Sequence, residues 1–385
     1  MHFRKKRTKN MANTVVISEV KTKRDIKEFV EFPLKLYKGN PYFVPLIYSD
    51  EVNLVKRGGE PEIADSIFLL ARREGRVVGR IQGILQKQYN ELHNEKRIRF
   101  TRFDAINDKE VSRALFSALE EWGRAKGMNQ LCGPLGYSDL DREGLLIWGF
   151  DENQTYEEQY NYEYYPELVE DAGLVKEVDW MEFELRAPEK KNEMLARVAA
   201  RSLELNRLHV ASTDMSKKDY IAKYKDGFFE CLEECYAHLY GVVPFTEKMK
   251  NELVEQFVLL IKKEFAIFIC DENEKVVAFG LGFPNLGDAL KKSGGRLTLP
   301  ALIRLLRVAN KPKALDLGLI AVRPEYQNSG LNAVMMNIMM GMLERGEIEK
   351  METNLNLETN EAVMSQWKLF NARHHKRRRS YLKNF

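Results

Sequence analysis

Two apolar segments about 200 positions apart share one pattern of hydrophobic and polar residues. Residues 67–81 read IFLLARREGRVVGRI, and residues 267–280 read IFICDENEKVVAFG. In each segment an apolar run leads into a polar turn, Glu74-Gly75 or Glu272-Asn273, and then into a second run that opens with paired valines. Short β-prone runs joined by such turns predict β-hairpins. The pattern therefore predicts two copies of one domain.

The segments that flank the two hairpins follow the same order. A short apolar step that ends in proline precedes each hairpin, at Phe43-Val44-Pro45 and at Val242-Val243-Pro244. After each hairpin the pattern predicts a strand, a helix, a strand, a helix and a final strand. The predicted ranges are 96–106, 109–126, 128–133, 162–172 and 176–185 in the first half, and 313–322, 329–346, 349–356, 359–372 and 376–383 in the second. Hairpins combined with strand–helix–strand units are typical of an α/β fold with a mixed sheet.

The duplication divides the 385 residues into two domains. A duplicated unit this long indicates tandem domains and not a solenoid repeat. The charged, proline-containing stretch that begins at Ala187 interrupts the periodicity. We expect a basic extension over residues 1–10, domains over 11–186 and 196–385, and a linker over 187–195.

Charge and cysteine content narrow the class of protein. The formal net charge is only +3, but basic residues gather at both ends of the chain and leave a mildly acidic body. We interpret the C-terminal basic run, Arg373 to Lys383, as a solvated face or a phosphate contact, with no specific nucleic acid as partner. The four cysteines have no metal-ligand spacing and are expected to be reduced core thiols, which favours a cytoplasmic protein. They are Cys132, Cys231, Cys235 and Cys270.

No apolar run approaches the roughly 20 residues that a membrane-spanning helix needs. The basic start is followed by mixed polar sequence, so we expect no signal peptide. Peripheral contact with a membrane surface stays open.

The step from the strand at 313–322 into the next helix carries the clearest chemistry. Residues 315–332 read LDLGLIAVRPEYQNSGLN. A turn that opens a helix presents free backbone N–H groups to an anion, and the helix dipole adds positive potential there. Gly330 permits close approach of the backbone to a phosphate group. The turn therefore predicts an anion site at the start of this helix.

This segment resembles the corresponding segment of GNAT (Gcn5-related N-acetyltransferase-like) enzymes. There a Val-x-Pro-x-Tyr step is followed by a phosphate-binding turn and a helix, and Val322-Arg323-Pro324-Glu325-Tyr326 matches that step. The resemblance implies a tandem GNAT fold, acetyl-CoA or a longer acyl-CoA as co-substrate, and no metal. It implies that CoA contacts Ile320, Ala321, Val322, Gln327, Asn328, Ser329, Gly330, Leu331, Asn332 and Asn360. Asn332 is larger than the small residue usual at its position, and Trp367 stands where many members have a tyrosine acid; we expect Trp367 to be a core aromatic.

The whole chain resembles the bacterial YghO-like group of two-domain GNAT-like proteins. In the first half the resemblance rests on the segments FDAIND at 103–108, GPLGYS at 133–138, EGLL at 143–146 and YYPEL at 164–168. The first half has no phosphate turn, because Asn107-Asp108 leads directly into a helix and Asp108 is a good N-cap. An acidic cap at this position argues against CoA binding in the first half.

The resemblance implies transfer of an acyl group from CoA to the amine of a small or lipid-like acceptor. A carboxylate would take the proton of the amine, and a backbone N–H beside a strand bulge, expected at Val322, would meet the oxyanion. Asp316 and Glu143 are the candidate bases; even spacing puts Asp316 on the same strand face as Val322 unless a bulge intervenes. For the acceptor we expect a pocket in residues 133–166. Its candidates are Tyr137, Ser138, Tyr160, Asn161 and Tyr164, whose alternative role is a tyrosine-rich domain interface.

Two alternative functions stay open from the sequence. One is a catalytically silent protein that binds CoA or lipid, and the other is an aminoacyl-tRNA-dependent transferase of the peptidoglycan type. His374-His375 is interpreted as a solvated pair, because adjacent residues of a strand point to opposite faces and cannot chelate one ion. The sequence leaves the oligomeric state undetermined.

Overall fold

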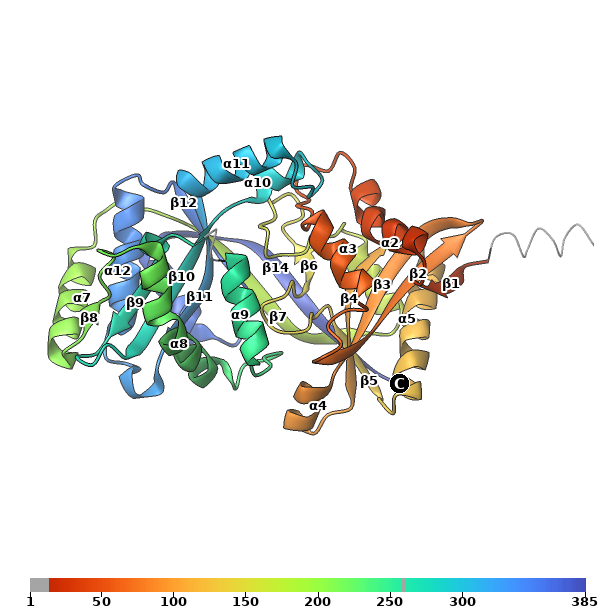
Figure 1. Cartoon of the computed structure of the whole chain (residues 1–385), viewed down its shortest axis with the longest axis horizontal. Helices are drawn as coiled ribbons and strands as arrows, with labels where there is room; N and C mark the ends of the chain where they lie inside the picture. Colours follow the sequence, from red (N-terminus) through yellow and green to blue (C-terminus); the bar gives the residue numbers. More distant parts are fainter. Residues whose placement is uncertain (1–13, 258–260) are drawn as a thin grey trace, which may run out of the picture. The chain divides into compact units, whose positions relative to one another are not determined.

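Both predicted hairpins are confirmed in the computed structural model, which describes residues 14–257 and 261–385 (Figure 1). Strands β2 (Ala64–Arg73) and β3 (Arg76–Gln86) pair antiparallel around Glu74 and Gly75, and both turn residues have positive φ. Strands β9 (Ala266–Cys270) and β10 (Val276–Pro284) form the second hairpin. The basic extension predicted over residues 1–10 lies outside the described residues.

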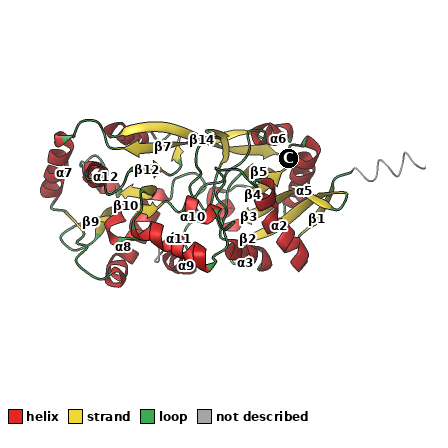
Figure 2. Cartoon of the chain, turned by 90° about the horizontal axis from the view of Figure 1, so that it is seen from above, coloured by secondary structure: helices red, strands yellow, loops and turns green. Residues whose placement is uncertain are grey.

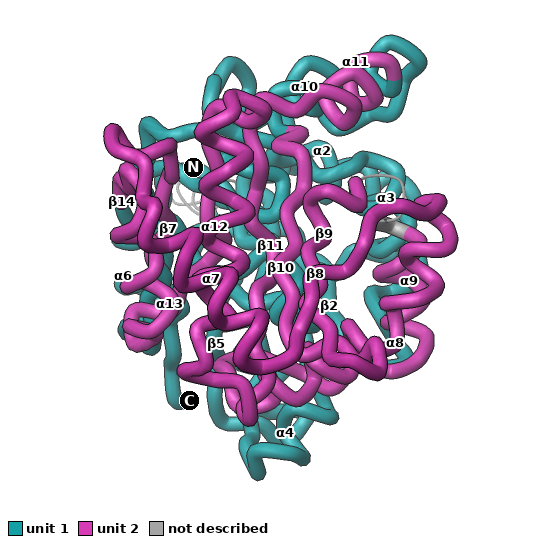
Figure 3. The backbone as a smooth tube through the Cα atoms, turned by 90° about the vertical axis from the view of Figure 1, so that its left-hand side faces the viewer, with its two compact units in different colours: residues 1–180, 287–302, 376–385 teal, residues 181–286, 303–375 magenta. Residues whose placement is uncertain are grey.

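The described chain forms two compact units, and each unit draws on both halves of the sequence (Figure 3). Unit 1 contains the described residues up to Trp180 together with 287–302 and 376–385, and unit 2 contains 181–286 and 303–375. Strand β7 (Val175–Arg186) passes from unit 1 into unit 2, and strand β14 (Asn371–Asn384) passes back. The domain division expected at 187–195 stays a prediction; helix α7 (Glu193–Asn206) begins within that stretch.

In unit 1 the strands follow the order β1-β2-β3-β4-β5-β14, and helices pack on both faces of the sheet. Strand β2 shows why, because Leu69 and Ala71 face the core under helix α5, whereas Phe68 and Leu70 face α2 and α3. This alternation is the period-2 pattern of a strand buried on both faces. The remaining elements of unit 1 are β1 (Val16–Glu19), α2 (Lys23–Leu36), α3 (Tyr48–Lys56), α4 (Lys87–His93), β4 (Arg97–Ala105), α5 (Lys109–Ala125), β5 (Gln130–Gly133), β6 (Leu145–Trp148), α6 (Tyr165–Asp171) and α10 (Gly287–Lys291).

In unit 2 the strands follow the order β14-β7-β12-β11-β10-β9-β8, again with helices on both faces (Figure 2). Ile269 of β9 packs with α12 and α7, and its neighbours Phe268 and Cys270 pack with α8. The elements of unit 2 are β8 (His209–Val210), α8 (Lys217–Tyr236), α9 (Glu247–Phe257), β11 (Ala314–Val322), α12 (Leu331–Glu344), β12 (Lys350–Thr353), β13 (Asn356–Leu357) and α13 (Glu361–Gln366), with short 3₁₀ turns at Lys263–Phe265, Pro324–Tyr326 and Trp367–Leu369. Helix α11 (Leu299–Asn310) begins in unit 1 and ends in unit 2.

From Lys376 on, the basic run at the C-terminus forms internal ion pairs in unit 1, so the solvated face predicted there is wrong. Arg373 belongs to unit 2, and its side chain is 52% exposed. Lys376 and Arg378 are buried, and both contact the carboxylate of Glu158. Arg379 binds the buried Asp179 at 2.7 Å. Because these cations already have carboxylate partners, they hold β14 in place and are not available to bind phosphate.

Candidate active site in the second unit

The turn predicted to bind an anion has the expected geometry in unit 2. Strand β11 ends at Val322, and helix α12 begins at Leu331 with Gly330 as its N-cap residue. Gly330 has φ of 85°, a left-handed conformation that L side chains rarely adopt. The backbone carbonyl of the preceding residue, Ser329, accepts a hydrogen bond from Ser202 Oγ at 2.8 Å, which connects the turn to helix α7.

The helix start leaves donors available. Within the described residues, the backbone N–H groups of Gly330, Leu331 and Asn332 donate to no acceptor, and no side chain caps the helix. Gln327, Asn328 and Asn332 are exposed, so the large Asn332 side chain does not fill the turn. The local positive potential of the helix dipole therefore faces solvent at this end.

Strand β11 separates from β12 just before this turn. The parallel ladder between them ends at Leu317 and Thr353, and beyond it β11 pairs with β10 alone among the described strands. On the edge of β11 that β12 no longer covers, the Tyr236 hydroxyl donates to the Ile320 carbonyl at 3.0 Å. The backbone nitrogen of Ile320 lies 3.3 Å from the same hydroxyl oxygen. The Tyr236 side chain thus forms the backbone hydrogen bonds of Ile320 that the arm of CoA was expected to form.

A bulge at Gly318 changes which side chains of β11 share a face. Leu281 lies opposite Leu319 and Gly282 opposite Leu317, which leaves Gly318 without a partner. Leu317 and Val322 therefore pack into one core although their spacing is odd. Asp316 lies on the other face, because the bulge intervenes between it and Val322 and cancels the even spacing. The bulge lies four residues before Val322.

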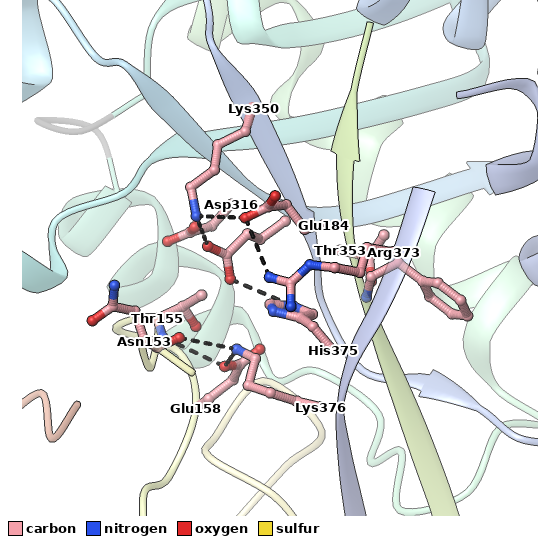
Figure 4. A network of polar contacts seen from close by, with 12 residues as sticks. Asn153, Thr155, Glu158, Glu184, Asp316, Lys350, Thr353, Arg373, His375 and Lys376 are labelled. Atoms are coloured by element: carbon pink, nitrogen blue, oxygen red, sulfur yellow. Dashed lines mark hydrogen bonds and ion pairs between the residues drawn. The ribbon is translucent and has the colours of Figure 1, made fainter. Parts of the chain in front are cut away.

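Asp316 belongs to a row of polar side chains that crosses the sheet of unit 2 (Figure 4). Its Oδ1 accepts a hydrogen bond from Asn285 at 2.7 Å, and Glu352 is its register partner on β12. Lys350 Nζ contacts Glu352 at 2.7 Å and Glu184 at 3.1 Å. Burial alone would lower the pKa of Lys350, but the two carboxylates outweigh burial and raise this pKa. The row is thus a connected, charged cluster within the sheet.

The histidine pair is not solvated as predicted. His375 is 3% exposed, and its Nε2 lies 3.7 Å from Glu352 Oε2. Its neighbour His374 stacks beside Phe183 with ring centroids 5.2 Å apart. Opposite orientation along the strand was correctly expected, but both faces of β14 are covered here. No group of metal-ligating side chains occurs among the residues that the structure describes.

Asn360 and Trp367 have structural contacts in unit 2. Asn360 caps helix α13 by accepting from the Val363 N–H at 3.3 Å. Trp367 is buried in the core, and its Nε1 donates to Asn356 Oδ1 at 3.2 Å. The prediction of a core aromatic at Trp367 is confirmed.

The five acceptor candidates lie in unit 1, and all of them have internal hydrogen-bond partners, Tyr160 through the Phe150 carbonyl. Asn161 bonds to both backbone groups of Leu146, and the Tyr164 hydroxyl donates to the Ala105 carbonyl. The Tyr137 hydroxyl receives a hydrogen bond from Gln82 at 2.6 Å. The Ser138 hydroxyl accepts a long bond from the Leu140 N–H.

Tyr160 is the one acceptor candidate that lines the cavity of about 90 Å³ found in unit 1. Two buried ion pairs, Arg80–Asp104 and Arg102–Glu51, also line it. A third arginine, Arg142, lines the cavity but donates only to the backbone carbonyls of Tyr156 and Val44. Burial lowers the pKa of Arg142 to about 10. The cavity thus contains one guanidinium that forms no ion pair with a carboxylate among the described residues.

Glu143, the second candidate base, is buried in unit 1. It is 4% exposed and has no hydrogen-bond or ion-pair partner among the described residues. Burial raises the pKa of Glu143 well above its usual range, and the nearby Asp139 carboxylate raises it further. A carboxyl group of this kind holds its proton at neutral pH more readily than an exposed glutamate does.

Sequence reasoning missed the residues that approach the site from distant elements. Tyr236 ends helix α8, 84 positions before Ile320, and no local pattern relates the two. Glu352 and Lys350 lie on β12, a strand of only four residues. Lys350 and Glu352 are two positions apart, which puts both on one face of the strand, and this spacing was the only sign in the sequence of a charged cluster there.

Comparison with known proteins gives two sequence relatives and several similar structures; no protein-family model matches the chain. The chain is 27% identical over 384 residues to protein YghO of Escherichia coli, covering 94% of this chain and 93% of that protein. It is 26% identical over 376 residues to bacterial ceramide synthase of Caulobacter vibrioides, covering 94% and 96%.

The similar structures concern the fold alone. A tandem GNAT protein from the clavulanic acid biosynthesis pathway matches with a TM-score of 0.54 and 11% identity, covering 96% of this chain and 98% of that one. A GCN5-related glucosamine N-acetyltransferase region of a fungal β-N-acetylglucosaminidase matches with a TM-score of 0.58 and 10% identity, covering 96% of this chain and 38% of that one.

Proposed function

From its tandem GNAT-like fold and its similarity to YghO over nearly the whole chain, we propose that this protein is an acyl-CoA-dependent N-acyltransferase of the GNAT type. It would move an acyl group from CoA to an amine of a small or lipid-like acceptor. The observation that carries the proposal is the start of α12. There the backbone amides of Gly330, Leu331 and Asn332 have no acceptor among the described residues, and they lie beside the open end of β11.

The proposed CoA site combines the turn with the strand edge. The amides of Gly330, Leu331 and Asn332 would bind the pyrophosphate, with Gln327, Asn328 and Ser329 around it. The pantetheine arm would pair with the backbone of Ile320 to Val322, as a peptide adds to a sheet edge. Since the Tyr236 phenol now contacts Ile320, bound CoA would replace that contact. Asn360 contributes little in this proposal, because its side chain caps its own helix.

The proposed reaction needs a neutral amine and a donor for the oxyanion. The amine nitrogen attacks the thioester carbonyl, the C–N bond forms, and the C–S bond breaks with its electron pair on sulfur. The backbone N–H of Val322, at the end of β11, would meet the oxyanion, as expected from the sequence. Asp316 is the proposed base of unit 2, at the inner end of that edge. Trp367 supplies no acid, so the thiolate would be protonated by solvent.

The acceptor is proposed to be a lipid-like amine. The similarity to a protein named bacterial ceramide synthase supports an amine of this class. The cavity beside Tyr160 in unit 1 is the candidate for binding part of the acceptor, with Arg142 as the group that would attract an anionic substituent. Glu143 stays the alternative base.

Thiol release separates turnover from silent binding. We expect the purified chain to release CoA thiol from acyl-CoAs when long-chain amino alcohols are added, and at a much lower rate without them. Amide product should be found by mass spectrometry. Glycerol esters or alcohols of the same chain length serve as matched compounds without an amine and should give no release above background.

Binding of CoA alone tests the first part of the proposal. Saturating CoA should raise the unfolding temperature, because a ligand that binds only the folded state stabilises it. No stabilisation would reject both the transferase and a silent CoA-binding protein. Stabilisation without thiol release, across acyl lengths and amines, would favour the silent protein.

A further inference from the structure

Helix α11 turns its apolar face outward. Leu299, Leu302, Ile303 and Leu306 follow the spacing i, i+3, i+4 and i+7, which puts them on one face of the helix. Leu299 is 72% exposed and Leu306 is 62% exposed, and Ala301 is the one buried residue of α11. Four large aliphatic side chains therefore form a stripe in contact with water.

Helix α5 of unit 1 has the opposite arrangement. Helix α5 buries Val111, Leu115 and Leu119 against the sheet of unit 1. A helix normally directs such a stripe into the core, because burial of each large aliphatic side chain contributes about 1.5–3 kcal/mol. The isolated protein does not gain this stabilisation from an apolar stripe that faces water. Such an exposed stripe indicates a surface that binds another molecule or a membrane.

The charges around α11 identify the class of partner. Residues 289–315 contain seven lysines and arginines and no aspartate or glutamate. Arg304, Arg307 and Lys311 have no carboxylate partner among the described residues. Lys313 pairs with Glu349, and its side chain is still 82% exposed. Lys291 and Arg296 likewise pair with carboxylates, with Asp288 and Glu31. The uncompensated positive charge beside the apolar stripe is therefore that of Arg304, Arg307 and Lys311.

We propose that α11 docks the protein on an anionic lipid surface. An amphipathic helix with aliphatic residues on one face and Lys or Arg beside them lies in the plane of a membrane interface, with each cation near an anionic surface contributing to binding. Helix α11 has 12 residues and two arginines, and no helix among the described residues is long and apolar enough to cross a membrane. This inference does not depend on acyl transfer, although it agrees with a lipid-like acceptor.

Cosedimentation of the full chain with vesicles tests the proposal. We expect binding to vesicles of 30% phosphatidylglycerol in phosphatidylcholine, little binding to phosphatidylcholine alone, and at least a tenfold weaker binding to the anionic vesicles in 0.5 M salt. The double variant Leu299→Ser/Leu306→Ser should reduce binding to the anionic vesicles at least tenfold. The variant Arg304→Gln/Arg307→Gln should reduce it and weaken its dependence on salt.

Leu205 provides the matched control, because it is 69% exposed on helix α7 and lies outside the basic stretch. Leu205→Ser should bind vesicles as the unchanged protein does. Circular dichroism and the unfolding temperature show whether each variant is folded, and the two arginine substitutions keep the apolar stripe in case the leucine variant is not.

Three results would overturn the proposal: no binding of the unchanged protein, equal binding to neutral vesicles, or full binding by the folded leucine variant. Size-exclusion chromatography with light scattering tests whether a second copy of the chain covers the stripe instead. A dimer that becomes a monomer in Leu299→Ser/Leu306→Ser, without any vesicle binding, would assign the stripe to a second copy of the chain.

Discussion

The two units treat the same helix start in opposite ways. In unit 1 the strand β4 leads within three residues to Asp108, whose carboxylate caps helix α5 and binds Arg73 at 2.6 Å. In unit 2 eight residues separate Val322 from Leu331, and the helix begins at Gly330 with no side-chain cap. In unit 1 the Asp108 carboxylate is the anion at the helix start, whereas in unit 2 the amides at the start of α12 stay available for an anionic ligand.

This difference shows how a duplicated domain can divide structural and binding roles. In unit 1 the Arg73 guanidinium lowers the pKa of Asp108, so the cap stays ionised at all but acidic pH. A fixed carboxylate at the helix start repels a phosphate and so opposes the attraction of the helix dipole. The proposed CoA site therefore belongs to unit 2.

The largest effect is expected from a carboxylate placed at the open helix start. Gly330→Asp would give unit 2 the anion that unit 1 has, and the new Cβ would lie 3.3 Å from Ser202. We expect CoA to bind about 100-fold more weakly, or about 2.7 kcal/mol, by titration calorimetry.

Gly346 at the other end of helix α12 is the matched control. It also has a positive φ, 70°, and a Cβ there would meet nothing within 4 Å. Gly346→Ala should carry the same kind of backbone strain with unchanged CoA affinity. Equal affinity of Gly330→Asp and the unchanged protein would break the comparison between the two helix starts.

The helix start of unit 2 was predictable because its chemistry is local. A proline step, a turn and a glycine stand in order within 18 residues, and Asp108 is likewise next to the helix that it caps. The face of Asp316 was not predictable, because the bulge at Gly318 arises where β11 meets a particular partner strand. Sequence spacing alone assumes a regular strand.

The burial of the charged residues of β14, such as Lys376, was also not predictable from the sequence. Lys376 and Glu158 are 218 positions apart, and their ion pair forms only when β14 returns to unit 1. A basic run of this composition is ordinarily solvated. His375 was misinterpreted for the same reason, since Glu352 reaches it from another strand.

A smaller effect is expected when unit 1 loses its cap. Asp108→Ala removes the bond to the Glu110 N–H and the ion pair with Arg73, which should lower the free energy of unfolding by about 1–2 kcal/mol. Because the folded-state pKa of Asp108 is lowered, this stabilisation is present above the unfolded pKa of about 3.8 and is lost as pH falls through the folded value. Urea unfolding at pH 7 and pH 3 measures both effects.

The neighbouring Asn107 is exposed and serves as the control, so Asn107→Ala should change stability little. CoA affinity should be the same for both variants, since unit 1 is not the proposed CoA site. Tighter CoA binding in Asp108→Ala would mean that unit 1 has a site blocked only by its cap.

Glu143 differs from Asp108 in unit 1, because the buried Glu143 carboxyl has no hydrogen-bond or ion-pair partner in the part of the chain that the structure describes. Its raised pKa means that the folded state binds the proton more tightly, so stability falls as pH rises above the unfolded value of about 4.5 toward the folded value. Glu143→Gln removes this titration. We expect the variant to be about 1 kcal/mol more stable than the unchanged protein at pH 8 and nearly equal to it at pH 4. Glu121→Gln, at an exposed position of α5, should show no such pH dependence. A pH-independent difference for Glu143→Gln would show that the carboxyl has the same pKa in the folded and unfolded states.

The smallest effect concerns the open edge of β11, where the comparison is least symmetrical. Tyr236 bonds to the Ile320 backbone, so a CoA arm must displace a hydrogen bond worth about 1 kcal/mol. Tyr236→Phe should therefore bind CoA about fivefold more tightly in calorimetry. Adenosine 3′,5′-bisphosphate, which lacks the pantetheine arm, should bind both proteins equally because the turn at Gly330 is unchanged. Weaker CoA binding by Tyr236→Phe would mean that the phenol holds the arm, whereas an equal gain for both ligands would place the effect at the turn. The pair of ligands thus separates the two parts of the site that only unit 2 leaves open.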